Sequence, residues 1–256
     1  MHSTLVRRTV LTASAVSLAL LATACGSGQA DDKKADAGPS AAASSAAPAA
    51  KGKTDAELAG LLVARADLPE HVFKAPGADE AAAAGAATSD KADCLPLVKA
   101  QSGAPVGAST GVARTKVTAK PKGASATAAP EDKLKAGLEA LSGTVTQVTL
   151  ASYDGKGAEE AFTALKTAGT ACAGGYGVTS GPDKVKISKV GAGAPVTAGD
   201  AALAYVVEAE ADGEKTTSQL VVVRRGNTLA SFYGLSLAGT AEQPKPVVDA
   251  QVKKLG

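Results

Sequence analysis

A polar tract over residues 26–53 cannot contribute to a folded core. Residues 26–53 are mostly Ala, Ser, Pro, Gly, Asp and Lys, without one large apolar side chain. A segment of this composition cannot bury enough apolar surface to offset its conformational entropy. Any fold is therefore confined to the stretch of about 200 residues that begins near Thr54, which is enough chain for one domain with a sizeable core.

The residues before this tract have the layout of an export signal. Arg7 and Arg8 precede an uncharged run over residues 9–22, which has the length of a signal-peptide apolar region and is too short to span a bilayer comfortably. Small residues then lead into Cys25, and this arrangement resembles a bacterial lipobox. We expect a signal peptide over residues 1–24 and acylation of Cys25. The alternative is ordinary secretory cleavage, with Cys25 as an incidental thiol. The arginine pair fits both general secretion and twin-arginine export.

Acylation would place the protein on the extracytoplasmic face of the cell membrane. One acyl chain holds a protein reversibly, whereas two or three, such as palmitate together with a diacylglycerol, hold it firmly. Residues 25–54 are then a lipid-anchored flexible linker with a root-mean-square reach of about 30 Å. Ser40, Ser44 and Ser45 belong either to a bare spacer, which we favour, or to a glycosylated stalk.

Charge and composition narrow the set of partners. The chain has 27 Lys and Arg against 25 Asp and Glu, and removal of Arg7 and Arg8 with the signal leaves 25 against 25. A chain without excess positive charge lacks the electrostatic attraction that nucleic-acid binding depends on. We expect no nucleic-acid partner and no cofactor. The expected partners are the membrane, through the lipid anchor, and an unidentified small molecule or envelope protein.

Two cysteines remain once Cys25 is assigned to the anchor. An even pair in an oxidising compartment favours a disulfide between Cys94 and Cys172. Two independent thiols are the less favoured alternative.

Residues 55–256 read as an α+β domain with one disulfide. A capping-box pattern at Thr54 and Glu57 starts a helix that is expected to end at Leu68-Pro69. We predict a mostly antiparallel sheet of about five or six strands with helices packed on one face. The expected strands cover 112–119, 145–153, 185–188, 203–208, 216–224 and 228–235, and the expected further helices cover 92–101, 130–141, 157–172 and 244–255. Asp212-Gly213 and Gly226-Asn227 have the composition of hairpin turns.

Several short motifs follow one another in a recognisable order. They are Asp67-Leu68-Pro69, Ala151-Ser152-Tyr153, the helix over 157–172, Gly199-Asp200-Ala201-Ala202, and the stretch from Val222 to Asn227. The order resembles actinobacterial lipoproteins that are similar to the extracellular sensor domain of PknH-type serine/threonine kinases. The resemblance implies a sensor fold with a cleft and disulfides. The chain departs from that family in having two domain cysteines, where the kinase sensors have two disulfides. It also lacks every kinase motif, so no catalytic residue is carried over.

Candidate chemical residues are few. His71 is the last histidine once His2 leaves with the signal, and it is expected at the surface. No zinc-ligand spacing and no Gly-x-Ser-x-Gly elbow is present. Asp200 is expected to be a turn residue, and Arg224 and Arg225 to flank an exposed turn or to bind an anion. The acidic pairs Glu159/Glu160 and Glu208/Glu210 are expected to be solvated, and the aromatic residues Tyr153, Tyr176, Tyr205, Phe232 and Tyr233 to be mostly core.

These observations predict a binding module rather than an enzyme. The favoured interpretation is a membrane-anchored, non-catalytic lipoprotein with a sensor-like ligand- or partner-binding domain. The sequence does not identify its ligand-binding residues, and we expect no metal ligands. The alternative is a lipid or glycolipid carrier, which needs an apolar cavity. A hydrolase is the third and least favoured possibility. A deep, dry cavity favours the carrier, and a shallow polar cleft favours the sensor.

Overall fold

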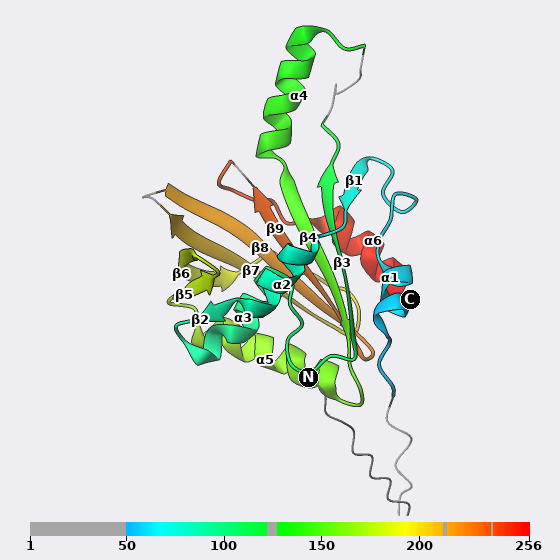
Figure 1. The fold of residues 1–256 in the computed structure, drawn as a ribbon, viewed down its shortest axis with the longest axis vertical. Coiled ribbons are helices and arrows are strands. Elements are labelled where there is room, and N and C mark those ends of the chain that lie inside the picture. Colours follow the sequence, from blue (N-terminus) through cyan, green and yellow to red (C-terminus); the bar gives the residue numbers. More distant parts are fainter. Residues whose placement is uncertain (1–49, 122–126, 212–213, 237) are drawn as a thin grey trace, which may run out of the picture. The chain divides into compact units, whose positions relative to one another are not determined.

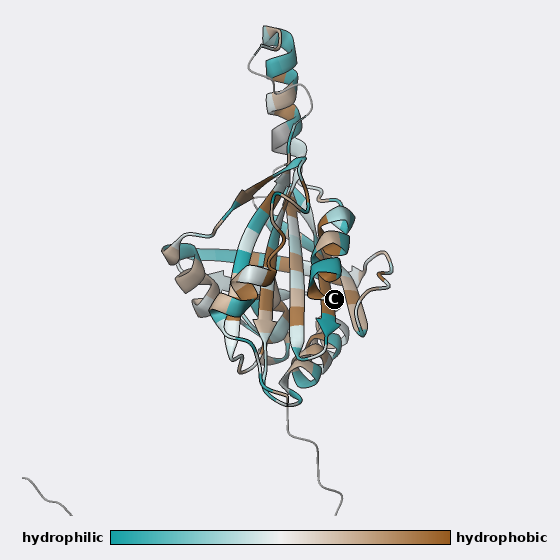
Figure 2. Ribbon diagram, turned by 90° about the vertical axis from the view of Figure 1, so that its right-hand side faces the viewer, coloured by the Kyte–Doolittle hydropathy of each residue, from teal (hydrophilic) through white to brown (hydrophobic). Residues whose placement is uncertain are grey.

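The core of the protein is one antiparallel sheet with helices on both of its faces (Figures 1 and 2). The structure is a computed structural model and describes residues 50–121, 127–211, 214–236 and 238–256, which belong to one compact unit. Cys25, most of the predicted linker and the predicted turn at Asp212-Gly213 lie outside these residues.

The described residues form nine strands and six α-helices. The strands are β1 (His71–Lys74), β2 (Thr88–Ser89), β3 (Gly111–Ala119), β4 (Thr144–Ser152), β5 (Tyr176–Ser180), β6 (Asp183–Ala192), β7 (Ala201–Ala211), β8 (Glu214–Arg225) and β9 (Thr228–Ser236). The helices are α1 (Asp55–Leu61), α2 (Ala78–Ala86), α3 (Leu95–Ser102), α4 (Pro130–Ser142), α5 (Gly157–Ala171) and α6 (Lys245–Leu255), with the 3₁₀ turn η1 (Ala92–Cys94) before α3. The order across the sheet is β1-β3-β4-β9-β8-β7-β6-β5-β2, and every neighbouring pair is antiparallel.

The α+β class is confirmed, but the predicted strand number is too small. The outermost strands, β1 and β2, have four and two residues, which is too short to show an alternating pattern. Strand β5 carries Gly177 and follows Gly175, and these glycines hid its pattern in the sequence. Its hairpin with β6 therefore looked like a single strand.

The prediction that helices pack on one face is wrong. Residues 220–223 of β8 are all apolar, and successive side chains of a strand point to opposite faces of the sheet. Both faces must therefore be covered by other elements. Leu220 and Val222 pack in the core under α3 and α5, whereas Val221 and Val223 pack in the core under α1 and α6. No helix among the described parts of the chain is long and apolar enough to cross a membrane.

Helix α1 begins with the predicted capping box but ends earlier than the sequence pattern indicates. The Thr54 amide donates to Glu57 Oε2 at 2.7 Å, and the Glu57 amide donates back to Thr54 Oγ1 at 3.4 Å. At the other end, the buried side chain of Gln251 accepts from the Val63 amide and donates to the Leu61 carbonyl, both at 2.8 Å. Gln251 of α6 thus takes over the backbone groups that another helical turn would have paired, and α1 ends at Leu61.

Candidate functional site

A cleft of about 240 Å³ lies where the edge of the sheet meets the beginning of α6. It is formed by the ends of β1, β3 and β4 together with the loop between β9 and α6. The residues that line it are His71, Val117, Ala119, Gly143, Thr144, Thr146, Glu242, Gln243, Pro244, Pro246 and Val247. We call this the His71 cleft.

The short edge strand β1 turns His71 into this cleft. His71 lies opposite Ala119 in the ladder, and the alternation of β1 places His71 and Phe73 on the inner face and Val72 and Lys74 on the outer face. The His71 side chain is half-buried, and its Nδ1 is buried without a hydrogen-bond partner among the described residues. A buried polar atom without a partner costs about 1–3 kcal/mol, so a ligand that supplies the partner gains from it.

Burial also keeps the imidazole neutral. Desolvation lowers the pKa of His71, the negative charge of Glu70 opposes this by raising the pKa, and the positive charge of Lys120 lowers it further. The neutral ring has one nitrogen that donates and one that accepts a hydrogen bond. His71 can therefore bind either a donor or an acceptor on a ligand.

The remaining lining combines hydroxyl groups and the polar side chains of Glu242 and Gln243 with an apolar floor. Thr146 is 2% exposed, and Thr144 Oγ1 accepts from the Glu242 amide at 2.9 Å, which fixes the loop before α6. Val117 and Val247 are buried beneath the opening. An apolar floor with a few converging polar groups is the usual composition of a small-molecule site.

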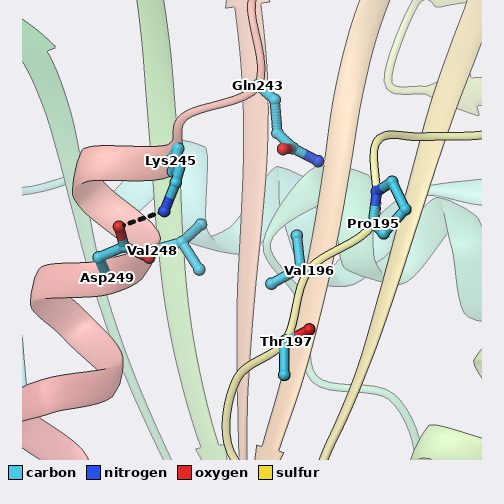
Figure 3. Close-up of a pocket in the computed structure, with 7 residues that line it drawn as sticks. All are labelled: Pro195, Val196, Thr197, Gln243, Lys245, Val248 and Asp249. Carbon is cyan, nitrogen blue, oxygen red and sulfur yellow. Dashed lines mark hydrogen bonds and ion pairs between the residues drawn. The ribbon is translucent and has the colours of Figure 1, made fainter.

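A second, smaller hollow of about 70 Å³ is also lined by Gln243 (Figure 3). Pro195, Val196 and Thr197 form one wall of it, and α6 forms the other with Val248 and the ion pair between Lys245 and Asp249 at 2.7 Å. Gln243 Nε2 donates to the Ala194 carbonyl at 2.9 Å. Gln243 lines both this hollow and the His71 cleft, so the two are adjacent.

The N-terminal end of the described chain is attached at the opposite end of the same strands. The amides of Gly52 and Lys53 donate to Asp154 Oδ1 at 2.8 Å and to Ser152 Oγ at 2.9 Å, and Asn227 Nδ2 donates to the Lys51 carbonyl at 2.7 Å. Residues 50–53, which the sequence assigned to the linker, thus contact the domain. Ser152 ends β4 and Thr144 begins it, so the cleft and the attachment lie about 25 Å apart along the sheet.

The structure brings four candidate charged residues together near this attachment. Asp200 Oδ2 accepts from the Gly226 amide at 2.7 Å, and Asp200 Oδ1 contacts Arg225 at 3.1 Å. Arg224 lies 3.6 Å from Asp200 and 3.9 Å from Glu159. These contacts lower the pKa of Asp200, the amide hydrogen bond being the largest cause. Asp200 therefore stabilises the β8–β9 turn, a contact that the sequence did not indicate, and the arginines are occupied by carboxylates.

The other candidate acids are at the surface. Glu208 lies 3.4 Å from Lys189 in an exposed pair, and Glu160 is exposed on α5. Tyr153, Tyr176 and Phe232 are at most 3% exposed, and Tyr205 and Tyr233 are partly buried, which confirms that the aromatic residues are mostly core. Among the described residues, no three His, Cys, Asp or Glu side chains are grouped so that they could hold a metal ion.

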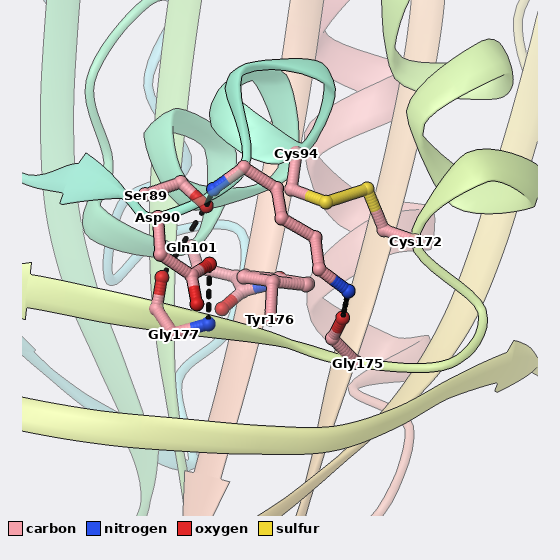
Figure 4. The surroundings of a disulfide bond; sticks show 9 residues. Ser89, Asp90, Cys94, Gln101, Cys172, Gly175, Tyr176 and Gly177 are labelled. Carbon is pink, nitrogen blue, oxygen red and sulfur yellow. Dashed lines mark hydrogen bonds between the residues drawn. A yellow bond between two sulfur atoms is a disulfide. The ribbon is translucent and has the colours of Figure 1, made fainter.

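The predicted disulfide is present between Cys94 and Cys172 (Figure 4). Both cysteines are 1% exposed, their Cα atoms are 5.8 Å apart, and the bond joins the start of α3 to the end of α5. Nearby, Asp90 Oδ1 accepts from the Gly177 amide at 2.8 Å and Lys91 Nζ donates to the Gly175 carbonyl at 2.7 Å. The disulfide and these contacts hold the segment before α3 against β5.

A wider hollow of about 520 Å³ lies at the surface over α3. It is lined by Gly85, Ala92, Leu95, Pro96, Lys99, Ala104, Pro105, Val106 and Gly107. Most of these residues are apolar, and Leu95 is 37% exposed. This hollow opens to solvent and has the chemistry that an apolar ligand would need.

Sequence reasoning named His71 but placed it at the surface, and it missed the other residues of the cleft. Thr144 and Thr146 look like ordinary strand residues, and Glu242 and Gln243 look like ordinary loop residues. They meet only because β1, β4 and the loop before α6 converge in space. No local signal in the sequence marks such a convergence.

Fold, cleft and disulfide together define an α+β domain whose sheet of nine described strands carries one half-buried histidine in a surface cleft. No protein-family model matches the sequence, and no curated protein matches it. Among solved structures, the crystal structure of the extracellular domain of PknH from Mycobacterium tuberculosis is similar, with a TM-score of 0.42 and 13% identity over 80% of this chain and 97% of that chain.

Proposed function

We propose that this chain is a non-catalytic lipoprotein, anchored to the extracytoplasmic face of the cell membrane through Cys25, whose domain binds a small molecule or an envelope protein in the His71 cleft. The observation that carries the proposal is the buried Nδ1 of His71, which has no hydrogen-bond partner among the described residues and lies in a cleft with an apolar floor. An atom in this position is stabilised when a ligand supplies a hydrogen bond.

The position of the cleft supports this function. The linker reaches the domain at the end of the sheet where Ser152 and Asn227 bind residues 51–53. The His71 cleft lies at the other end of β3 and β4. A domain tethered at one end of its sheet presents the other end to the surroundings, where it is accessible to a ligand.

The arrangement of charged residues supports a binding role over a catalytic one. Asp200, Arg224, Arg225 and Glu159 are engaged with one another around a turn. The pKa of His71 is lowered by burial, and the cleft that it lines also contains threonine hydroxyls, apolar side chains and the polar side chains of Glu242 and Gln243. Binding needs only complementarity of this kind, whereas hydrolysis needs an activated nucleophile with a positioned base.

The carrier is the second candidate, because the hollow over α3 is apolar. In that case an acyl chain or another apolar group would contact Leu95, Pro96 and Val106. If the protein is a carrier, replacement of the exposed Leu95 by Asp abolishes ligand binding. If the ligand binds in the His71 cleft, the same replacement leaves binding unchanged, because Leu95 does not line that cleft.

The lipid anchor is tested by fractionation of cells that express the full chain. The wild-type protein is expected in the membrane fraction with an acylated N-terminal peptide, and the Cys25→Ala protein is expected to lose firm membrane attachment. A Cys25→Ala protein that stays fully membrane-bound contradicts the proposal.

The binding site is tested by NMR of the ¹⁵N-labelled mature chain, titrated with the small-molecule fraction of the envelope. Amide shifts are expected at Val117, Thr144 and Thr146. The Thr146→Val variant, which removes one hydroxyl without changing volume much, is expected to reduce these shifts. Thr179→Val, at an exposed position of β5, is the matched control. Shifts that gather elsewhere, or that Thr146→Val leaves unchanged, contradict the site.

A further inference from the structure

Several backbone donors in the lining of the His71 cleft are already used within the protein. The Gly143 amide donates to the Glu139 carbonyl at 2.9 Å, and the Val247 amide donates to the Pro244 carbonyl at 3.0 Å. The Glu242 amide is bound by a threonine hydroxyl, and the lining contains two prolines, which have no amide hydrogen. A ligand that presents hydrogen-bond acceptors therefore finds few free backbone donors here.

The side chains of the lining supply acceptors instead. Gln243 Nε2 donates to the Ala194 carbonyl, which leaves Gln243 Oε1 as an acceptor. The Glu242 carboxylate accepts only, and the Thr146 hydroxyl can accept as well as donate. In the neutral imidazole of His71, the buried Nδ1 is an acceptor when the proton is on Nε2. A ligand that supplies donors therefore matches the cleft.

The charge of the lining is negative. Glu242 is the one charged side chain among the described residues that line the cleft, the imidazole being neutral, and no described cation forms an ion pair with it. Lys245, in the adjacent hollow, is paired with Asp249 at 2.7 Å (Figure 3). Lys120 donates to a backbone carbonyl at 2.6 Å, and Glu70 opposes its effect on the imidazole. The cleft therefore has a negative charge that a cation can balance.

The size and the floor of the cleft restrict the ligand further. Its volume of about 240 Å³ lies below the ~300–1,000 Å³ of sites for drug-sized ligands. Val117 and Val247 are buried beneath the opening and offer apolar contact. The ligand that fits is compact, with an apolar body beside its polar group.

We propose that the ligand of the His71 cleft is a compact organic cation, an apolar body that carries an ammonium or guanidinium group. The inference rests on the proposed binding role of the cleft and names the class of its ligand. The cation balances Glu242, and its N–H groups donate to the acceptors of the lining, including His71 Nδ1. Charge-assisted hydrogen bonds of this kind are about twice as strong as neutral ones. A carboxylate ligand would instead bring a second negative charge beside Glu242.

The test is an NMR titration of the ¹⁵N-labelled mature chain with three probes of one shape: benzylamine, benzyl alcohol and benzoate. Benzylamine is expected to shift the amides of Val117, Thr144 and Thr146, with a dissociation constant about tenfold or more below those of the other two probes. Glu242→Gln keeps the size of the side chain and is expected to raise the benzylamine constant about tenfold, with little change for benzyl alcohol. The matched control is Glu160→Gln, which removes an exposed carboxylate on α5 and is expected to change neither.

The outcomes separate this inference from the proposed site. Benzoate or benzyl alcohol that binds in the cleft as tightly as benzylamine overturns the cation and leaves the site intact. A benzylamine affinity that Glu242→Gln does not change overturns the inference too, as do benzylamine shifts that gather outside the cleft. If no probe shifts a cleft amide, the inference fails, and the titration with the envelope fraction decides separately whether the cleft binds a ligand.

Discussion

At the scale of single residues, a few positions couple distant parts of the chain. Gln251 ends α1 from α6, Asp200 holds the β8–β9 turn, and Gly111 lets the N-terminal segment lie against β3. In none of the three cases do the adjacent residues in the sequence indicate the distant contact. Asp200 alone was predicted in kind, as a turn residue, because Gly199-Asp200 has turn composition.

The stability of the protein should depend on the protonation of His71. Its pKa is lowered from the ordinary 6.5, so the unfolded state binds the proton more readily than the folded state. The contribution is fully present above about pH 6.5 and is lost as the pH falls from there towards the lowered value. In urea unfolding at pH 7.5 and pH 5, the wild type should lose more stability than His71→Phe.

The carboxylates with lowered pKa, such as Asp67 and Asp200, lose their contribution at lower pH and do so in both proteins. The difference between the two proteins therefore isolates His71. If wild type and variant show the same pH dependence, the imidazole is not desolvated as the structure shows.

Gly111 is predicted to be intolerant of any side chain. A Cβ at this position would lie 2.4 Å from the Lys53 carbonyl oxygen and 2.6 Å from the Thr54 carbonyl carbon, both of which are backbone. Gly111→Ala should cost about 1–3 kcal/mol and displace the N-terminal segment, so trypsin should cut at Lys51 and Lys53 faster. Gly60→Ala, where no atom lies within 4 Å, is the control and should be neutral or stabilising by up to about 1 kcal/mol. Equal stability of the two variants would show that residues 50–54 do not contact β3 in solution.

At the scale of elements, the sequence predicted what local patterns determine. The α5 stripe, the β7–β9 strands and the capping box of α1 were all predicted, because periodicity and capping chemistry act over a few residues. Strand β1 has four residues and β2 has two, and neither has a pattern of its own. They form because each pairs with the unpaired edge of a neighbouring strand, β1 with β3 and β2 with β5.

The disulfide joins two elements whose helical character was predicted, and its effect on stability is testable. The bond closes a chain segment with a sequence separation of 78, which the chain-entropy model values at about 4–5 kcal/mol. Reductant should lower the free energy of unfolding in urea by about 2–5 kcal/mol. The Cys94→Ser/Cys172→Ser protein, which should already be destabilised, is the control and should not respond to reductant. Unchanged stability of the wild type on reduction would contradict the tie between α3 and α5.

At the scale of the whole molecule, the sheet separates the attachment of the N-terminal segment from the His71 cleft. Residues 50–53 are bound at one end of β3 and β4, and the His71 cleft opens at the other. The α+β class was predictable, because strand alternation and helical periodicity are local patterns. The cleft was not, because His71, Thr146 and Gln243 come from three regions that only the fold brings together.

The central claim is that the His71 cleft holds a ligand, and native mass spectrometry of the protein extracted from its own envelope tests it most directly. We predict a defined added mass on the wild type that is lost in Thr146→Val and His71→Phe and kept in Leu95→Asp, which alters only the hollow over α3. An added mass that the cleft variants keep and Leu95→Asp loses would contradict the account and favour the carrier. A wild type that carries no added mass under any extraction condition would contradict the claim as well.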